Sequence, residues 1–304
     1  MLRPAIEHPP EVEELSGFRE PAGPESARLD ISGIAIELTG LPADLAAEMA
    51  RAYHPYLSAP TGADRPLRIS VTDAPIDYFL PPGFAGGWEV YRMLTDLRGG
   101  VFRSVSYRFA SWFDVARREG QMALGHGALD PASRAMENFL RSAVAWLALD
   151  RGGFFLHGAS IVRDDRCYLF YGPSGAGKST LSAMSRSGKV NSDDLTLVLH
   201  RPEGLLAAGG PFRGTYRIGA PILGTFPVAG FYRLRKDERV SVDPDEGGCF
   251  ADLIGNLPFV VDQLPGHPHL IDQVRAVTRE ARFRTLRFNK DDDFWPAIDA
   301  ELTT

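Results

Sequence analysis

Residues 171–180 read YGPSGAGKST, and from Gly172 to Ser179 they match the pattern G-x-x-x-x-G-K-[ST]. The glycines reach backbone angles closed to other residues, so successive amides can point inward at phosphate oxygens. The lysine supplies an ammonium group for the outer phosphates, and the next hydroxyl is a ligand for Mg²⁺. CYLFY precedes the loop and STLSAM follows it, which is the strand–loop–helix order the pattern requires. The stretch therefore predicts a phosphate-binding loop. The residues expected to bind the nucleotide phosphates are Gly172, Pro173, Ser174, Gly175, Ala176, Gly177, Lys178, Ser179 and Thr180.

Two adjacent aspartates follow the loop. Asp193 and Asp194 end the stretch VNSDD, just before the apolar run LTLVLH, which predicts a strand. In phosphate-loop proteins an acidic residue on a neighbouring strand holds magnesium, directly or through water. One of a pair can also accept a proton from an attacking hydroxyl. The alternative is a solvated turn, because Asn, Ser and Asp favour turns.

Three other places in the sequence are candidates for the site. His157 lies in the predicted strand GGFFLHGASIV, where it could face the outer phosphate or be a core histidine bonded to backbone. Arg213 in GGPFRGTYR suits phosphate charge, although a surface hairpin explains the segment equally well. The acidic run NKDDDFW (289–295) is interpreted as the capped start of a final helix rather than a metal site.

Composition narrows the class of partner. The chain has 304 residues, a formal net charge of −6 and a sequence pI of about 5.7. Binding to a phosphate backbone needs a basic face, so we expect no nucleic-acid partner. No stretch approaches about 18 uninterrupted apolar residues, and the N-terminus lacks the pattern of a secretory signal. We expect two free thiols, Cys167 and Cys249, in a cytoplasmic protein with no membrane partner.

The sequence suggests three regions. Residues 1–28 are rich in Pro and Glu and are interpreted as a flexible tail or a docking arm. Residues 29–128 predict a small α+β domain, with strands at 32–40 and 67–74, a helix between them and antiparallel strands that turn at Gly99–Gly100. Residues 129–304 predict the phosphate-loop domain.

The ordered set FLHGASIV, CYLFYGPSGAGKSTL, VNSDDLTLV and GGPFRGTY resembles HPr kinase/phosphorylase and its relatives, and more distantly ATP-dependent phosphoenolpyruvate carboxykinase. The similarity covers roughly residues 150–290. It implies an α/β fold with a phosphate-loop core in a mixed sheet flanked by helices, plus a small N-terminal α+β domain. It also implies ATP and Mg²⁺ as cofactors and a homo-oligomer.

The resemblance assigns roles to the site residues. His157 would help to position the phosphate or the base, and Asp193 would accept the proton of a serine hydroxyl. Ser179 and Asp194 would hold the metal. Lys178 and Arg213 would complete the catalytic set. The enzymes that act on HPr usually carry an acidic residue where this chain has Thr180, so a protein or peptide other than HPr is the expected acceptor.

Three functions follow as hypotheses. The leading one is an ATP/Mg²⁺-dependent kinase that phosphorylates a serine of a protein or precursor peptide, with a small-molecule kinase as a variant. The second is a regulatory ATPase or GTPase switch, for which the sequence offers no N-K-x-D or L-S-G-G-Q pattern. The third is a nucleotide-binding module without catalysis, which would not require His157 or the paired aspartates.

Overall fold

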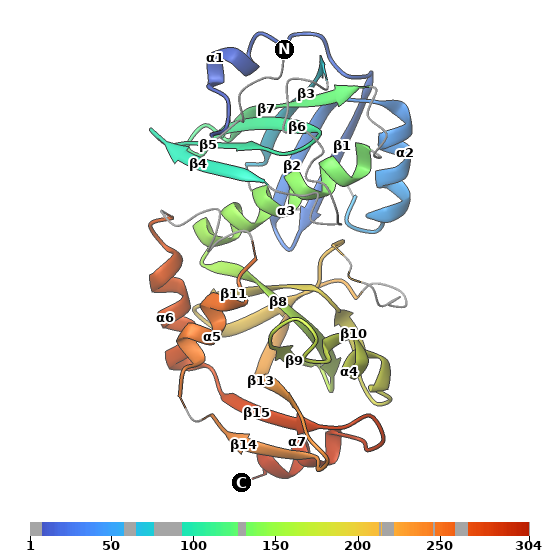
Figure 1. Cartoon of the computed structure of the whole chain (residues 1–304), viewed down its shortest axis with the longest axis vertical. Helices are drawn as coiled ribbons and strands as arrows, with labels where there is room; N and C mark the ends of the chain where they lie inside the picture. Colours follow the sequence, from blue (N-terminus) through green and yellow to red (C-terminus); the bar gives the residue numbers. More distant parts are fainter. Residues whose placement is uncertain are drawn as a thin grey trace. The chain divides into compact units, whose positions relative to one another are not determined.

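The computed structural model describes residues 8–57, 65–75, 93–126, 132–212, 214, 222–245, 247–258 and 267–303. The chain is a mixed α/β protein with two mixed sheets, as the sequence predicted at the level of fold class. It forms two compact units (Figure 1). One contains the described residues up to Val144, and the other contains those from Ala145 onward.

The first unit is built on a seven-stranded sheet in the order β1-β2-β3-β7-β6-β5-β4. β2 and β7 both run parallel to β3, and the other neighbours are antiparallel. The strands are β1 (Glu25–Ile31), β2 (Ile34–Leu41), β3 (Leu67–Pro75), β4 (Leu94–Arg98), β5 (Val101–Val105), β6 (Phe109–Asp114) and β7 (Glu119–His126). The turn at Gly99–Gly100 between β4 and β5 confirms the predicted hairpin.

Both faces of this sheet carry buried side chains. The helices of the unit are α1 (Val12–Leu15), α2 (Ala43–Ala52) and the first part of α3 (Ala132–Asp150). Phe109 on β6 contacts Phe139 on α3, with ring centroids 6.2 Å apart. The next residue, Ala110, points to the opposite face, where it packs with Leu15 of α1. Alternation along one strand therefore supplies two apolar layers.

Part of the segment expected to be a flexible tail or a docking arm is packed against the first sheet. Leu15 is fully buried, and the Gln121 amide donates hydrogen bonds to the carbonyls of Leu15 (2.9 Å) and Phe18 (2.7 Å). The docking interpretation holds for this part of the segment. The flexible one does not, because residues 25–28 already belong to β1.

The second unit is an eight-stranded sheet in which two long strands change partners along their length. Its strands are β8 (Gly153–Arg163), β9 (Arg166–Tyr171), β10 (Lys189–Ser192), β11 (Leu195–Arg201), β12 (Gly204–Ala208), β13 (Phe226–Lys236), β14 (Ser241–Pro244) and β15 (Phe283–Phe288). The first half of β8 pairs with β11, and its second half pairs with β9 and β10. β13 likewise pairs first with β12 and then with β9 and β15. As a result β8 pairs with β11, β11 with β12, β12 with β13, β13 with β9 and β9 with β8, so these five strands form a closed ring.

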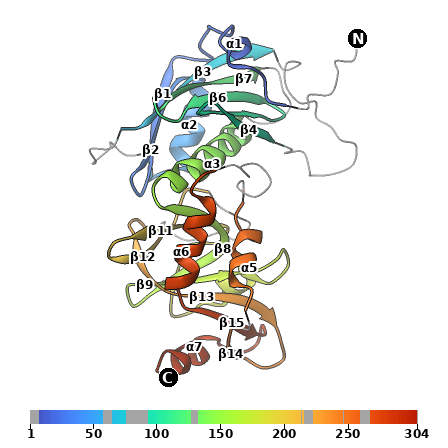
Figure 2. The same ribbon diagram turned by 90° about the vertical axis from the view of Figure 1, so that its left-hand side faces the viewer.

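Four helices complete this unit: α4 (Lys178–Met184), α5 (Cys249–Gly255), α6 (Leu270–Glu280) and α7 (Trp295–Leu302). α5 and α6 lie side by side (Figure 2). The last helix begins at Trp295, directly after the acidic run, as predicted. Its N-cap residue, Phe294, makes no side-chain cap hydrogen bond, and the Asp293 carboxylate accepts one from the Trp295 amide (3.1 Å). Among the described residues no helix is long and apolar enough to span a membrane.

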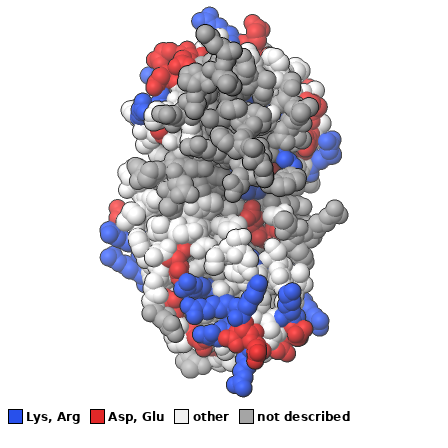
Figure 3. All heavy atoms as spheres, in the orientation of Figure 1, with Lys and Arg blue, Asp and Glu red and all other residues white. Residues whose placement is uncertain are grey.

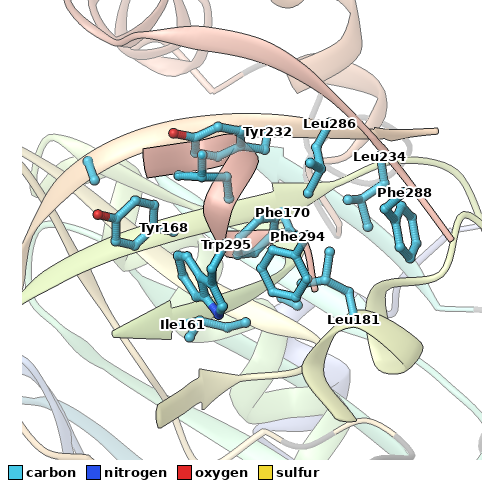
Figure 4. Close-up of a cluster of buried hydrophobic side chains, with 13 residues drawn as sticks. Ile161, Tyr168, Phe170, Leu181, Tyr232, Leu234, Leu286, Phe288, Phe294 and Trp295 are labelled. Carbon is cyan, nitrogen blue, oxygen red and sulfur yellow. The ribbon is translucent and has the colours of Figure 1, made fainter. Parts of the chain in front are cut away.

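An apolar cluster holds the glycine-rich loop against the sheet (Figure 4). Phe170 on β9 lies at its centre, 5.8 Å from Phe294 and 6.4 Å from Trp295 between ring centroids. Leu181 of α4 and Phe288 at the end of β15 pack into the same cluster. Both sides of the loop are thus anchored in a buried core, because β9 precedes the loop and α4 follows it.

Candidate functional site

Strand register brings the predicted site residues together. On one side of β8, Gly158 pairs with Tyr171, the last residue of β9 before the glycine-rich loop. On the other side, His157 pairs with Leu195, the first residue of β11 after the aspartates. The loop and the aspartate pair therefore lie at the same level, on either side of β8. Neighbouring strands are about 4.8 Å apart.

The loop runs from Gly172 to Gly177, and its conformation requires glycine at the end. Gly177 has φ +108°, and an added Cβ would lie 2.6 Å from the Phe288 ring. Gly175 has φ +79° with open space around it. The predicted helix begins at Lys178 as expected, and α4 has seven residues.

Lys178 is folded back onto the loop. Its Nζ donates to the carbonyl oxygens of Gly172 (2.9 Å) and Pro173 (3.4 Å). Burial lowers the pKa of Lys178 below its usual value, and the Asp194 carboxylate opposes that shift. A buried ammonium whose partners are neutral carbonyls has little compensation for its lost hydration. It is therefore suited to an anion that would supply full charge neutralisation.

His157 and Asp194 form a pair across β8 and the start of β11. The Nδ1 atom of His157 lies 3.0 Å from Asp194 Oδ1. The His157 amide donates to the Asn256 carbonyl at 2.7 Å, and the Gly158 amide donates to the Asp194 carbonyl at 2.9 Å. These bonds position the backbone of His157 and the backbone of Asp194, whose carbonyl accepts from Gly158. This histidine is 40% exposed, which rules out the alternative of a core histidine.

Asp193 is oriented by a different group. It is 3% exposed, so the aspartate pair is not a solvated turn. The Gly214 amide donates to Asp193 Oδ1 at 3.0 Å. Beneath the pair, the Ser192 hydroxyl donates to the Leu195 carbonyl at 2.8 Å and fixes the turn between β10 and β11. Buried carboxylates require such donors, because an unpaired one loses its hydration without compensation.

A single cavity of about 800 Å³ connects these groups. The predicted residues that line it are His157, Ser174, Gly175, Gly177, Lys178, Ser179, Thr180, Asp193 and Asp194. Gly172, Pro173 and Ala176 were also predicted, but they lie outside the lining. Gly172 and Pro173 instead provide the carbonyls that Lys178 binds. Arg213 and Arg217 lie outside the described residues.

No pattern in the sequence indicated the far wall of this cavity. Lys236 and Asp237 at the end of β13, and Phe288 to Asp291 at the end of β15, also line it. β9, β13 and β15 run parallel, with Arg233 paired to Tyr171 and Lys236 paired to Phe288. Their carboxyl ends meet at one edge, which is where open α/β sheets bind ligands.

Oxygen ligands for a metal ion are present in the cavity. The Ser179 hydroxyl and the Asp194 carboxylate both line it, and Mg²⁺ prefers one or two such protein oxygens together with phosphate oxygens and water. The described part of the chain has no group of three or more His, Cys, Asp and Glu side chains that could hold a metal ion by themselves. The residues present fit a magnesium ion that arrives with a polyphosphate.

Comparison with known proteins adds no assignment. No model of a protein family matches the chain, and no curated protein matches it at a significant level. The functional conclusion therefore rests on the geometry of this cavity.

Proposed function

We propose that this protein is an ATP/Mg²⁺-dependent kinase that transfers the γ-phosphate to a serine hydroxyl of a protein or precursor peptide. The observation that carries the proposal is that Lys178 and the glycine-rich loop share one cavity with His157, Asp193 and Asp194. A phosphate-binding loop alone would suit many nucleotide-binding proteins. Two oriented carboxylates and a histidine beside it supply groups for proton transfer.

The loop would hold the phosphates. Its three glycines have positive φ, a conformation that lets successive amides point at an anion, and Lys178 would exchange its carbonyl partners for phosphate oxygens. Catalysis in phosphoryl transfer consists mostly of positioning and charge neutralisation, so a preformed cradle is the main requirement. In these terms the second unit would be the phosphate-loop core of a kinase related to HPr kinase/phosphorylase.

The two aspartates differ in their surroundings, and this supports a division of roles. Asp193 is held by the Gly214 amide and would accept the proton of the attacking hydroxyl as its oxygen bonds to phosphorus and the bond to the ADP oxygen breaks. Asp194 is paired with His157. With Ser179, it would hold the magnesium ion, which neutralises developing charge when bound.

The test is transfer of label from [γ-³²P]ATP with Mg²⁺, comparing the wild-type protein with Lys178→Ala. Proteins and peptides encoded beside its gene would be offered as acceptors, together with HPr. We expect label on an acceptor serine, lost in the variant. Release of free phosphate at the same rate with and without acceptors would instead favour a regulatory ATPase.

A further inference from the structure

The cavity has two chemically different ends, and their order across the sheet gives a direction to any ligand that fills it. On the side of the ring that carries the glycine-rich loop, β11 pairs with β8, β8 with β9, β9 with β13 and β13 with β15 (Figure 1). His157 and the aspartates lie at the β8 and β11 end. The glycine-rich loop follows β9 in the middle. Lys236 and Asn289 lie at the β13 and β15 end.

The wall at the β13 and β15 end is preformed. The side-chain oxygen Oδ1 of Asn289 accepts hydrogen bonds from the backbone amides of Asp291 (2.9 Å) and Asp292 (2.8 Å). The side-chain Nδ2 of Asn289 donates to the backbone carbonyl of Glu238 at 2.8 Å, which ties the turn after β15 to the turn after β13. Arg287 donates to Asp237 at 3.1 Å and joins the same two turns. Because of these bonds, the wall has a fixed shape without a ligand.

The charge of this wall does not suit a polyphosphate. Lys236 and Lys290 contribute two cations, and Asp237 and Asp291 contribute two carboxylates, so the formal charges cancel. On the face of the second unit seen in Figure 3, Lys and Arg side chains likewise gather beside Asp and Glu side chains. Both lysines are exposed, and their aliphatic stems offer apolar surface to a planar ring while the ammonium groups stay in water.

We propose that a bound nucleotide lies with its outer phosphate toward β8 and β11 and its nucleoside against Lys236, Asp237 and the Asn289–Asp291 turn. This inference rests on the proposed kinase function and extends it by assigning the nucleoside subsite. β9 and β15 are two strand spacings apart, roughly 10 Å, so the wall lies beyond the phosphates held by the loop. The reverse orientation would leave the oriented Asp193 without an attacking hydroxyl to deprotonate.

Photo-crosslinking with 8-azido-ADP tests the orientation, because the azide is on the base. The full-length protein is irradiated with the probe and Mg²⁺, and the labelled peptides are mapped. We expect label on the peptides that contain residues 236–237 or 288–291, and loss of label when excess ADP competes. Label confined to the Gly209–Gly214 segment or to β11 would overturn the proposed orientation while leaving nucleotide binding intact.

Binding measurements separate the two proposals. ADP and pyrophosphate are titrated with Mg²⁺ into wild-type protein and the Lys236→Ala/Lys290→Ala variant. We expect ADP affinity to fall about tenfold and pyrophosphate affinity to change less than about twofold, since only ADP has a nucleoside. Equal losses for both ligands would overturn the subsite. Failure of the wild-type protein to bind either ligand would overturn the kinase proposal itself.

The control variant is Arg166→Ala/Lys189→Ala. It removes two exposed positive charges from the same unit outside the cavity lining. It should bind both ligands as the wild type does. A tenfold loss of ADP affinity in this control would mean that net charge, and not contact with the nucleoside, explains the effect.

Discussion

At the scale of single residues, Asp193 depends on a neighbour that has no side chain. Gly214 lies beside it with its amide 3.0 Å from Asp193 Oδ1, and a Cβ on Gly214 would lie 2.7 Å from Oδ2 of the same carboxylate. An alanine at this position must displace either the carboxylate or its own backbone. Glycine at position 214 therefore lets the backbone come close enough to the Asp193 carboxylate for its amide to donate this hydrogen bond.

We predict that Gly214→Ala lowers kcat by roughly 10- to 100-fold, because small displacements of a catalytic group are costly. ADP affinity should change less than about twofold, since the nucleotide phosphates are held elsewhere. The matched control is Gly255→Ala, where nothing lies within 4 Å of the added methyl group. Steady-state kinetics and ADP titration measure both effects. A lower ADP affinity with an unchanged kcat would contradict the positioning role.

Because nucleotide binding depends on protonated Lys178, the affinity for nucleotide should fall at alkaline pH. Burial lowers its pKa from the usual 10.5, and only the ammonium form neutralises phosphate. ADP affinity should therefore fall as the pH rises through this lowered pKa. The guanidinium of Lys178→Arg stays protonated over this range, so its affinity, even if weaker overall, should not show the same decline. ADP titrations from pH 7 to pH 10 test this prediction. If the ADP affinity of the wild type and of Lys178→Arg falls in parallel, the pH dependence belongs to another group.

At the scale of elements, the loop conformation can be tested with a matched pair of glycines. Gly175 and Gly177 both have positive φ, but only Gly177 lies against the Phe288 ring. Gly175→Ala should lower the free energy of unfolding by about 1–2 kcal/mol through backbone strain. Gly177→Ala should cost at least about 1 kcal/mol more through overpacking. Denaturant unfolding measures the loss of free energy of unfolding in each variant. Adding Phe288→Leu to Gly177→Ala should reduce the difference between that loss and the loss in Gly175→Ala. Equal losses in the two single variants would contradict the packing explanation.

Elements with a local signature could be predicted from the sequence. The strand–loop–helix order around Gly172–Ser179, the strand after Asp194 and the hairpin at Gly99–Gly100 are all confirmed. Each of these is marked by glycines or by a run of apolar residues within a few positions. The sequence could not decide between a flexible tail and a docking arm for residues 8–28, because burial of Leu15 depends on a sheet formed by later residues.

The far wall of the cavity could not be predicted. Lys236 and Asn289 reach it only because β13 pairs in parallel with both β9 and β15, and those pairings join segments far apart in the chain. Nothing in periodicity specifies which strands become neighbours. Gly214 was part of a segment noted for its arginines, but its amide contact with Asp193 depends on tertiary structure.

At the scale of the whole molecule, buried neutral groups on the central strands should limit stability at high pH. Burial raises the pKa of Cys167 from 9.0 to about 12 and raises those of Tyr171 and Tyr232 above their usual 10.0. These groups ionise first in the unfolded chain, so the free energy of unfolding should fall as the pH rises above about 9, by up to ~1.4 kcal/mol per pH unit for each group. Lys178 acts in the opposite sense, because its pKa is lowered.

Urea unfolding between pH 7 and pH 10.5 measures this dependence. Cys167→Ala should have a shallower decline above pH 9, whatever its stability at pH 7. A free energy of unfolding that stays constant or rises with pH would show that these groups are not held neutral in the folded protein.

The most direct test of the central claim is a crystal structure with Mg²⁺ and the β,γ-imido analogue of ATP. We predict phosphate density in the Gly172–Gly177 loop with Lys178 bound to it, and the γ-phosphate beside Asp193 and Asp194. The nucleoside should lie against the turns after β13 and β15. Density for the analogue outside this cavity, or phosphates that do not contact the loop, would contradict the proposal that the cavity is a kinase active site.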